Sequence, residues 1–186
     1  AKGKLEQQLD IDIGIPSVTL DRSKPELWLS KAKGSGEITW KHWELYEDYL
    51  LTKQKPFPEK TVTSIDQATD NILDRIGNPK LAGPWSRRGL VIGSVQMGKT
   101  GNFIGLISKA ADVGYKFIVV LAGLHNILRE QTQQRIEEGF IGLETCGNNA
   151  QMSVGKVGVG LKRPEGEPRP IYLTTRDLDF NKIVSG

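Results

Sequence analysis

Eight consecutive residues near the middle of the chain have the types and spacing of a phosphate-binding loop. Residues 93–100 read Gly-Ser-Val-Gln-Met-Gly-Lys-Thr, which fits the pattern of two glycines followed by Lys and Ser or Thr. Glycine permits the sharp turn and the close approach of the backbone to an anion that such a loop requires. Lys99 would supply a positive charge to the β and γ phosphates of a nucleoside triphosphate, and the Thr100 hydroxyl would bind Mg²⁺. The predicted cofactors are therefore ATP, or another nucleoside triphosphate, and Mg²⁺.

All eight residues are predicted to bind nucleotide, and two of them also have a predicted catalytic role. The nucleotide-binding set is Gly93, Ser94, Val95, Gln96, Met97, Gly98, Lys99 and Thr100, of which Lys99 and Thr100 are the catalytic pair and Thr100 is the metal ligand. The alternative is a glycine-rich turn with an incidental lysine. The flanking sequence favours the phosphate-binding loop, because an apolar strand is predicted at Leu90–Ile92 and a helix at Thr100–Ala111.

A second group of polar residues follows the next predicted strand. Residues 116–122 are apolar and β-branched, which predicts a strand, and residues 126–138 predict a helix that Gly139 stops. Ligands bind at the carboxyl ends of strands in open α/β folds. We therefore predict nucleic-acid contacts from Asn126, Leu128, Arg129, Gln131, Thr132 and Arg135. A solvated helix with Asn126 as its N-cap and an Arg135–Glu138 salt bridge is equally compatible with the sequence.

A third strand is predicted at Ile171–Thr175. The hydroxyls of Thr174 and Thr175 at its end could bind a phosphate of a nucleic acid, or they could cap a following helix. Strands that alternate with helices imply parallel pairing with right-handed crossovers. The fold class predicted from this order is α/β, namely a partial RecA-like P-loop domain with a parallel sheet, preceded by a helical N-terminal extension.

Three regions are expected along the chain. Residues 1–38 form an extended or poorly ordered N-terminal segment, residues 39–80 a helical region, and residues 85–186 the first part of a P-loop NTPase domain. A weak hairpin is predicted within the glycine-rich residues 144–160. The order of the regions places the phosphate-binding loop near the start of the third.

The helical region contains two predicted helices. The first has an aromatic face with spacings of three and four, which we interpret as core rather than as a site for a nucleobase. That face consists of Trp40, Trp43, Tyr46, Tyr49 and Leu50. The second helix is predicted to begin at a Ser64 cap and to close at Gly77.

Composition limits the cellular setting in which the protein is expected, but it does not indicate an activity. The formal charge of +3 is compatible with a nucleic-acid partner and equally with none. Cys146 is the single cysteine, so an internal disulfide is impossible and a reducing interior is the natural setting. No apolar run approaches the roughly 20 residues of a membrane span, and the first residues lack the apolar centre of a signal peptide. We expect a cytoplasmic protein with no membrane partner.

Two blocks of the sequence closely resemble the Z-one domain family. The first block is residues 89–116, which includes the loop, and the second is residues 120–135. Residues 66–79 also match, so the resemblance covers roughly residues 40–140, and it extends more thinly to residues 171–180. Members of that family are large bacterial proteins, often described as endonucleases, that are found among restriction or defence genes and look like relatives of superfamily-two helicases. The family usually has Ser and Ala where this chain has Met97 and Gly101. Neither difference removes the predicted phosphate contacts, because position 97 offers its backbone amide.

The resemblance implies a function for each motif. Residues 93–100 match the first helicase motif, residues 128–135 the next, DNA-contacting motif, and Thr174-Thr175 the one after. The family's acidic motif, an apolar strand ending in Asp-Asp-Glu, is not found and would lie beyond Gly186. We therefore expect this chain to be the N-terminal part of a longer protein, truncated before the acidic motif and nearly inactive by itself.

The expected function is that of a nucleotide-binding fragment of a DNA-acting P-loop NTPase in a bacterial restriction or defence endonuclease system. Expected partners are DNA, the remaining part of the same chain, and a nuclease or other defence subunit. Two alternatives remain open, a P-loop kinase or phosphotransferase that acts on a small molecule and a non-catalytic module in which bound nucleotide organises an assembly.

Overall fold

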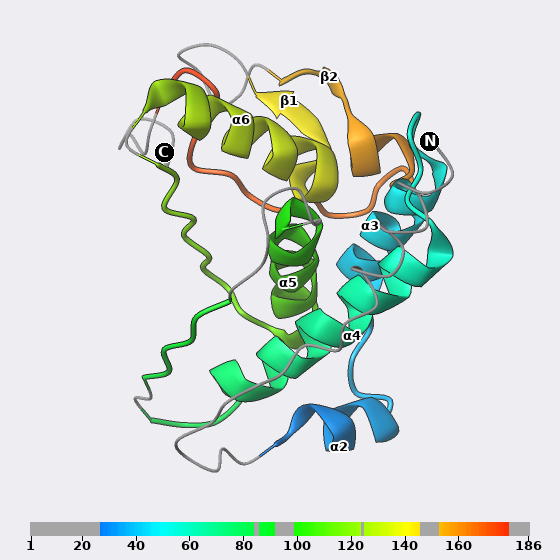
Figure 1. The fold of residues 1–186 in the computed structure, drawn as a ribbon, viewed down its shortest axis with the longest axis vertical. Coiled ribbons are helices and arrows are strands. Elements are labelled where there is room, and N and C mark those ends of the chain that lie inside the picture. Colours follow the sequence, from blue (N-terminus) through cyan, green and yellow to red (C-terminus); the bar gives the residue numbers. More distant parts are fainter. Residues whose placement is uncertain (1–26, 84–85, 92–98, 124, 146–152, 179–186) are drawn as a thin grey trace, which may run out of the picture.

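The computed structural model describes residues 27–83, 86–91, 99–123, 125–145 and 153–178, and these residues are mostly helical (Figure 1). The α-helices are α2 (Leu29–Gly34), α3 (Lys41–Thr52), α4 (Glu59–Ile76), α5 (Lys99–Val113) and α6 (Asn126–Ile136). A π-helix, η1 (Glu137–Ile141), continues directly from α6, and a 3₁₀ helix, η2 (Gly158–Leu161), lies near the end. Two short strands, β1 (Leu143–Thr145) and β2 (Ser153–Lys156), pair antiparallel.

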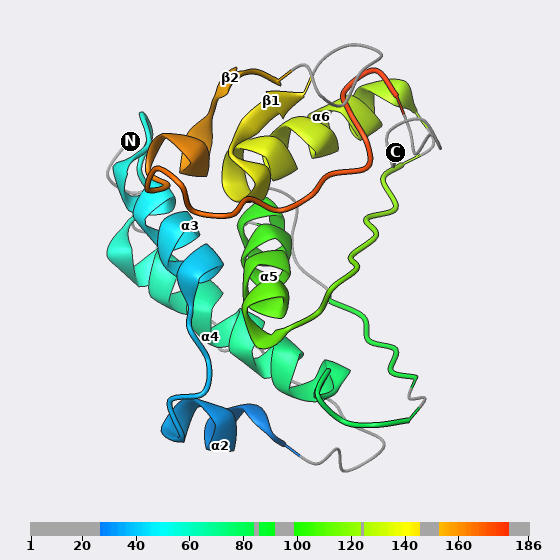
Figure 2. The ribbon, with the colours of Figure 1, turned by 180° about the vertical axis from the view of Figure 1, so that it is seen from behind.

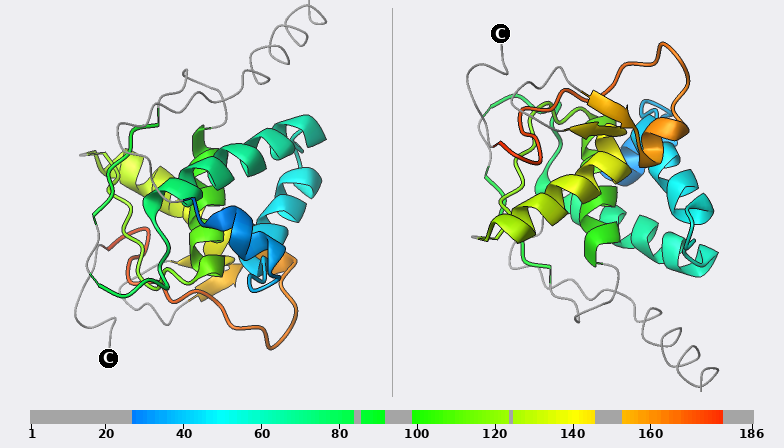
Figure 3. Two further views of the ribbon diagram at one scale, coloured as in Figure 1. Left: turned by 90° about the horizontal axis from the view of Figure 1, so that it is seen from below. Right: turned by 90° about the horizontal axis from the view of Figure 1, so that it is seen from above.

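The main core forms where α3, α4 and α5 meet. In the left view of Figure 3, α4 crosses α5, and α3 lies to one side of α5. The buried side chains of this cluster are Trp43, Tyr46, Leu50, Val62, Ile65, Ile104 and Val159, with Trp40 and Tyr49 partly buried against them. The aromatic face of α3 is therefore part of the core, and our interpretation of that face is confirmed.

A buried lysine ties α5 to α4. Lys109 is fully buried, and its Nζ lies 2.7 Å from Asp70 Oδ1 and 2.8 Å from the carbonyl oxygen of Asp66. The same Nζ lies 4.4 Å from the centroid of the Trp43 ring. A buried ammonium needs such partners because its desolvation would otherwise be very costly.

The C-terminal part of α5 also holds the start of α3. The carboxylate of Asp112 accepts hydrogen bonds from the backbone N–H groups of His42 and Trp43, each at 3.0 Å. These are donors in the first turn of α3 that the helix itself cannot satisfy. Together, Lys109 and Asp112 fix the direction of α5, whose N-terminal end carries Thr100.

The predicted parallel sheet is wrong. Among the described residues the sheet is the antiparallel pair β1–β2, in which Glu144 lies opposite Gly155. Residues 116–122 and the described parts of the other two predicted strands, 90–91 and 171–175, are irregular. Their apolar side chains are largely exposed, with 91% exposure for both Leu121 and Ile171. The RecA-like α/β fold is therefore not the fold of the described chain.

The physical reason lies in what strand propensity measures. β-branched residues fit a pleated surface that is buried by neighbouring strands and by elements packed on its faces. In Figures 1 and 2, residues 86–91 and 116–123 run as extended connections beside the helices, with no neighbouring strand in the part of the chain that is described. The sequence of these segments favours strands locally, but a local preference does not determine whether another strand lies alongside to pair with.

Helices agree better with the predictions, apart from their ends. α3 and α5 fall close to the predicted ranges, and β1–β2 forms a hairpin inside residues 144–160 except that it begins one residue earlier. Ser64 does not cap a helix, because α4 begins at Glu59 and the Ser64 hydroxyl donates to the Lys60 carbonyl oxygen at 2.9 Å.

The end of α6 also differs from the prediction. Gly139 does not stop the helix, which continues as η1 to Ile141. Gly142 is the C-cap, and its φ of 81° suits glycine. Asn126 is the first helical residue rather than the N-cap, which is His125. In the described ranges no helix is long and apolar enough to cross a membrane.

Candidate functional site

The N-terminal end of α5 is the described part of the predicted phosphate-binding loop. Residues 93–98 lie outside the described residues, whereas Lys99 and Thr100 form the start of α5. The first backbone N–H groups of a helix lack partners inside the helix, and the positive end of its dipole lies there. The Thr100 side chain is partly exposed in this first turn. This arrangement suits an anion, with a hydroxyl oxygen beside it.

Arg135 of α6 reaches the same turn. Its Nη1 donates a hydrogen bond of 3.1 Å to Thr100 Oγ1, across 35 residues of sequence. Figures 1 and 2 show α6 lying across the N-terminal end of α5. The Arg135–Glu138 salt bridge that the sequence allowed does not form, and Glu138 instead accepts hydrogen bonds from Tyr49 and Gln134. Two predicted site residues from separate motifs therefore meet.

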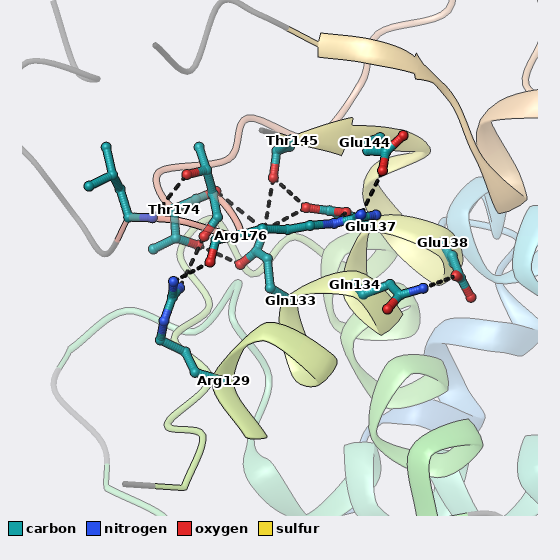
Figure 4. A network of polar contacts seen from close by, with 11 residues as sticks. Arg129, Gln133, Gln134, Glu137, Glu138, Glu144, Thr145, Thr174 and Arg176 are labelled. Carbon is teal, nitrogen blue, oxygen red and sulfur yellow. Dashed lines mark hydrogen bonds and ion pairs between the residues drawn. The ribbon is translucent and has the colours of Figure 1, made fainter. Parts of the chain in front are cut away.

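Another part of α6 holds the segment that contains Thr174 and Thr175. Arg129 donates from Nη1 to the Thr175 carbonyl oxygen at 3.0 Å and from its other terminal nitrogen to the Arg176 carbonyl oxygen. The Thr174 hydroxyl donates to Gln133 Oε1 at 2.8 Å, and Gln133 Nε2 donates back to the Thr174 carbonyl oxygen at 3.3 Å (Figure 4). These contacts join the two predicted nucleic-acid motifs.

The Thr175 hydroxyl takes part in a local turn. Thr175 is buried, and its Oγ1 accepts a hydrogen bond of 3.1 Å from the backbone N–H of Leu178. The Thr175 backbone N–H donates to the Leu178 carbonyl oxygen at 2.9 Å. The Thr175 hydroxyl is therefore engaged in a local turn of the backbone, and the described residues contain no helix after it for the hydroxyl to cap.

A buried carboxylate organises the polar contacts beside Thr174 (Figure 4). Glu137 is fully buried and accepts hydrogen bonds from Arg176 Nε at 2.7 Å and from the Thr145 hydroxyl. Arg176 also donates from Nη1 to Glu144 at 2.6 Å. A buried charge of this kind is tolerated when it is paired and hydrogen-bonded. Burial, and secondarily the charge of Glu137, raises the pKa of the nearby Tyr172.

The remaining predicted nucleic-acid residues point elsewhere. Asn126, Leu128 and Gln131 are exposed, and the Thr132 hydroxyl donates to the Leu128 carbonyl oxygen at 2.7 Å within its own helix. The side chains of α6 therefore divide into three groups, which face the 174–176 segment, Thr100 and solvent.

Three important residues were missed from the sequence, namely Gln133, Glu137 and Arg176. Gln133 and Glu137 are four residues apart, which places them on the same side of a helix. That spacing could have predicted that the side chains of Gln133 and Glu137 lie next to each other. Arg176 is 39 residues from Glu137, and no local pattern indicates such a contact.

The described residues contain no group of three or more His, Cys, Asp or Glu side chains that could hold a metal ion. The Thr100 hydroxyl is a hard oxygen ligand that suits Mg²⁺, which usually combines one or two protein ligands with phosphate oxygens and water. Thr100 therefore fits the predicted metal as one ligand among several.

Comparisons with known protein families, with curated proteins and with solved structures return no match for this chain.

Proposed function

We propose that this chain binds ATP or another nucleoside triphosphate, together with Mg²⁺, through residues 93–100. The single observation that carries the proposal is the sequence of that loop, which places Lys and Thr directly after its second glycine. The course of α5 supports it, because this helix starts with Lys99 and Thr100 and so offers N-terminal amides beside them. Bound Mg²⁺ would neutralise part of the negative charge on the phosphates during hydrolysis of the nucleotide.

Each residue has a distinct part in this proposal. The backbone amides of the loop donate hydrogen bonds to phosphate oxygens, and Lys99 neutralises charge on the β and γ phosphates. The Thr100 hydroxyl oxygen is one ligand of the metal. α5 holds these groups in place because Lys109 and Asp112 fix that helix against α4 and α3.

We further propose that nucleotide binding serves a DNA-acting protein of a bacterial restriction or defence endonuclease system in the cytoplasm. This part of the proposal rests on the resemblance to the Z-one domain family in residues 89–116 and 120–135. The contacts between α6 and residues 174–176 support it, since they join the segment that matches the DNA-contacting motif to the segment that matches the motif after it. DNA and other subunits of such a system are the proposed partners.

The test is ATP hydrolysis by the protein at its full length, measured with and without duplex DNA, beside a Lys99→Ala variant. We expect hydrolysis that rises with DNA and is lost in the variant. Binding of ATP with no turnover under either condition would favour the non-catalytic organising module. Hydrolysis that persists without the Lys99 side chain would contradict the proposal, because the loop would not then be its source.

A further inference from the structure

The Arg135 guanidinium donates a hydrogen bond to the Thr100 hydroxyl oxygen, which the metal would need as a ligand. Arg135 Nη1 donates to Thr100 Oγ1 at 3.1 Å, and this is the Thr100 hydroxyl contact that the described residues show. Arg135 is exposed, and its side chain is long and rotatable. A cation is therefore already present beside the first turn of α5, on a side chain that can change its position without disturbing the core.

The backbone that carries Arg135 is held firmly on both sides. Gln133 is buried and bonded to Thr174, and Glu137 is fully buried and bonded to Arg176 and Thr145. The helix changes from α to π immediately after Ile136, a feature found frequently at functional sites. Movement of Arg135 is thus confined to its side chain, which keeps the guanidinium within reach of the α5 terminus.

Metal binding and the observed hydrogen bond compete for Thr100. A divalent cation bound to the Thr100 oxygen would lie close to the guanidinium that donates to the same atom, and two cations at that separation repel each other. The guanidinium would then turn toward the nearest negative charge. In a bound triphosphate, the phosphate oxygens beside the metal carry that charge, and a planar guanidinium can bind two phosphate oxygens at once.

We infer that Arg135 binds the terminal phosphate of a nucleoside triphosphate and so distinguishes ATP from ADP. This inference rests on the proposed function, because it needs nucleotide at residues 93–100. It assigns to Arg135 a ligand other than the nucleic-acid backbone that the sequence suggested. With Mg·ADP bound, the metal would still displace the guanidinium from Thr100, but the γ phosphate that would accept its hydrogen bonds is missing.

The test compares the binding of Mg·ATP and Mg·ADP by isothermal titration calorimetry, using the whole chain. Arg135→Ala should weaken Mg·ATP binding on the order of tenfold to a hundredfold, the value of a hydrogen bond to a charged group, and change Mg·ADP binding less than about threefold. Arg135→Lys should recover part of the preference, because it keeps the charge but not the planar fork. Gln134→Ala is the matched control, since Gln134 is exposed and contacts Glu138.

The possible outcomes are distinct. A fall in the ATP-to-ADP preference in Arg135→Ala, with the control unchanged, supports the inference. An equal effect on both nucleotides, or no effect, overturns it, and so does weaker DNA binding with an unchanged preference. Lys99→Ala should weaken the binding of both nucleotides. If the wild-type chain binds neither nucleotide, the proposed function is refuted, and the inference with it.

Discussion

Glu137 illustrates why single residues at this site were only partly predictable. Its carboxylate is fully buried and depends on Arg176, which lies in a segment 39 residues away in the sequence. The sequence analysis selected Arg129 and Arg135 on a predicted helix, and Thr174 and Thr175 at the end of a predicted strand. Their partners are set by tertiary contacts, which helical or strand periodicity does not encode. The residue types were therefore predictable, whereas the pairings were not.

Removal of the Glu137 carboxylate should destabilise the protein more than removal of its neighbour. Glu137→Ala should lower the free energy of unfolding by about 3 kcal/mol, because Arg176 and Thr145 lose a buried partner. Glu144→Ala is the matched control, because Glu144 pairs with the same arginine but is partly exposed. It should cost about 1 kcal/mol or less. Urea denaturation measures both, and equal losses would contradict the role given to Glu137.

At the scale of elements, helices were predictable because their signals are local. The aromatic spacing in α3 and the apolar spacing in α5 each describe one face of a helix, and both faces are buried. The three strands predicted near residues 90, 118 and 173 needed partners from elsewhere in the chain. The described residues supply none, so these segments are irregular, and several of their apolar side chains, such as Leu121 and Ile171, are exposed.

Exposure of the 116–122 segment can be tested by mutation. Leu121 is 91% exposed, so Leu121→Ser should change the free energy of unfolding by less than about 0.5 kcal/mol. Leu73 of α4 is fully buried, and Leu73→Ala should cost about 2 to 5 kcal/mol. Thermal or urea unfolding of the two variants provides the comparison. A large loss for Leu121→Ser, similar to that of Leu73→Ala, would show that this segment is buried and would contradict the described fold.

At the scale of the whole molecule, the described chain is a helical body with one antiparallel strand pair. α5 packs against α3 and α4 in the main core, and its N-terminal end contacts α6 through the hydrogen bond between Arg135 and Thr100. The sequence order of strands and helices predicted a parallel α/β sheet, which was wrong because an alternating order does not guarantee that the strands pair. The placement of Thr100 at the start of a helix agrees with the sequence, and its contact with Arg135 was not foreseen.

The central claim is that residues 93–100 bind a nucleoside triphosphate, and calorimetric titration of this chain with Mg·ATP tests it most directly. The wild-type chain should bind, and Lys99→Ala should bind on the order of tenfold to a hundredfold more weakly, because a charged donor to phosphate is lost. Gln134→Ala should bind like the wild type, since Gln134 contacts Glu138 rather than the α5 terminus. Equal affinity of the wild-type and Lys99→Ala chains, or no binding by either, would contradict the claim.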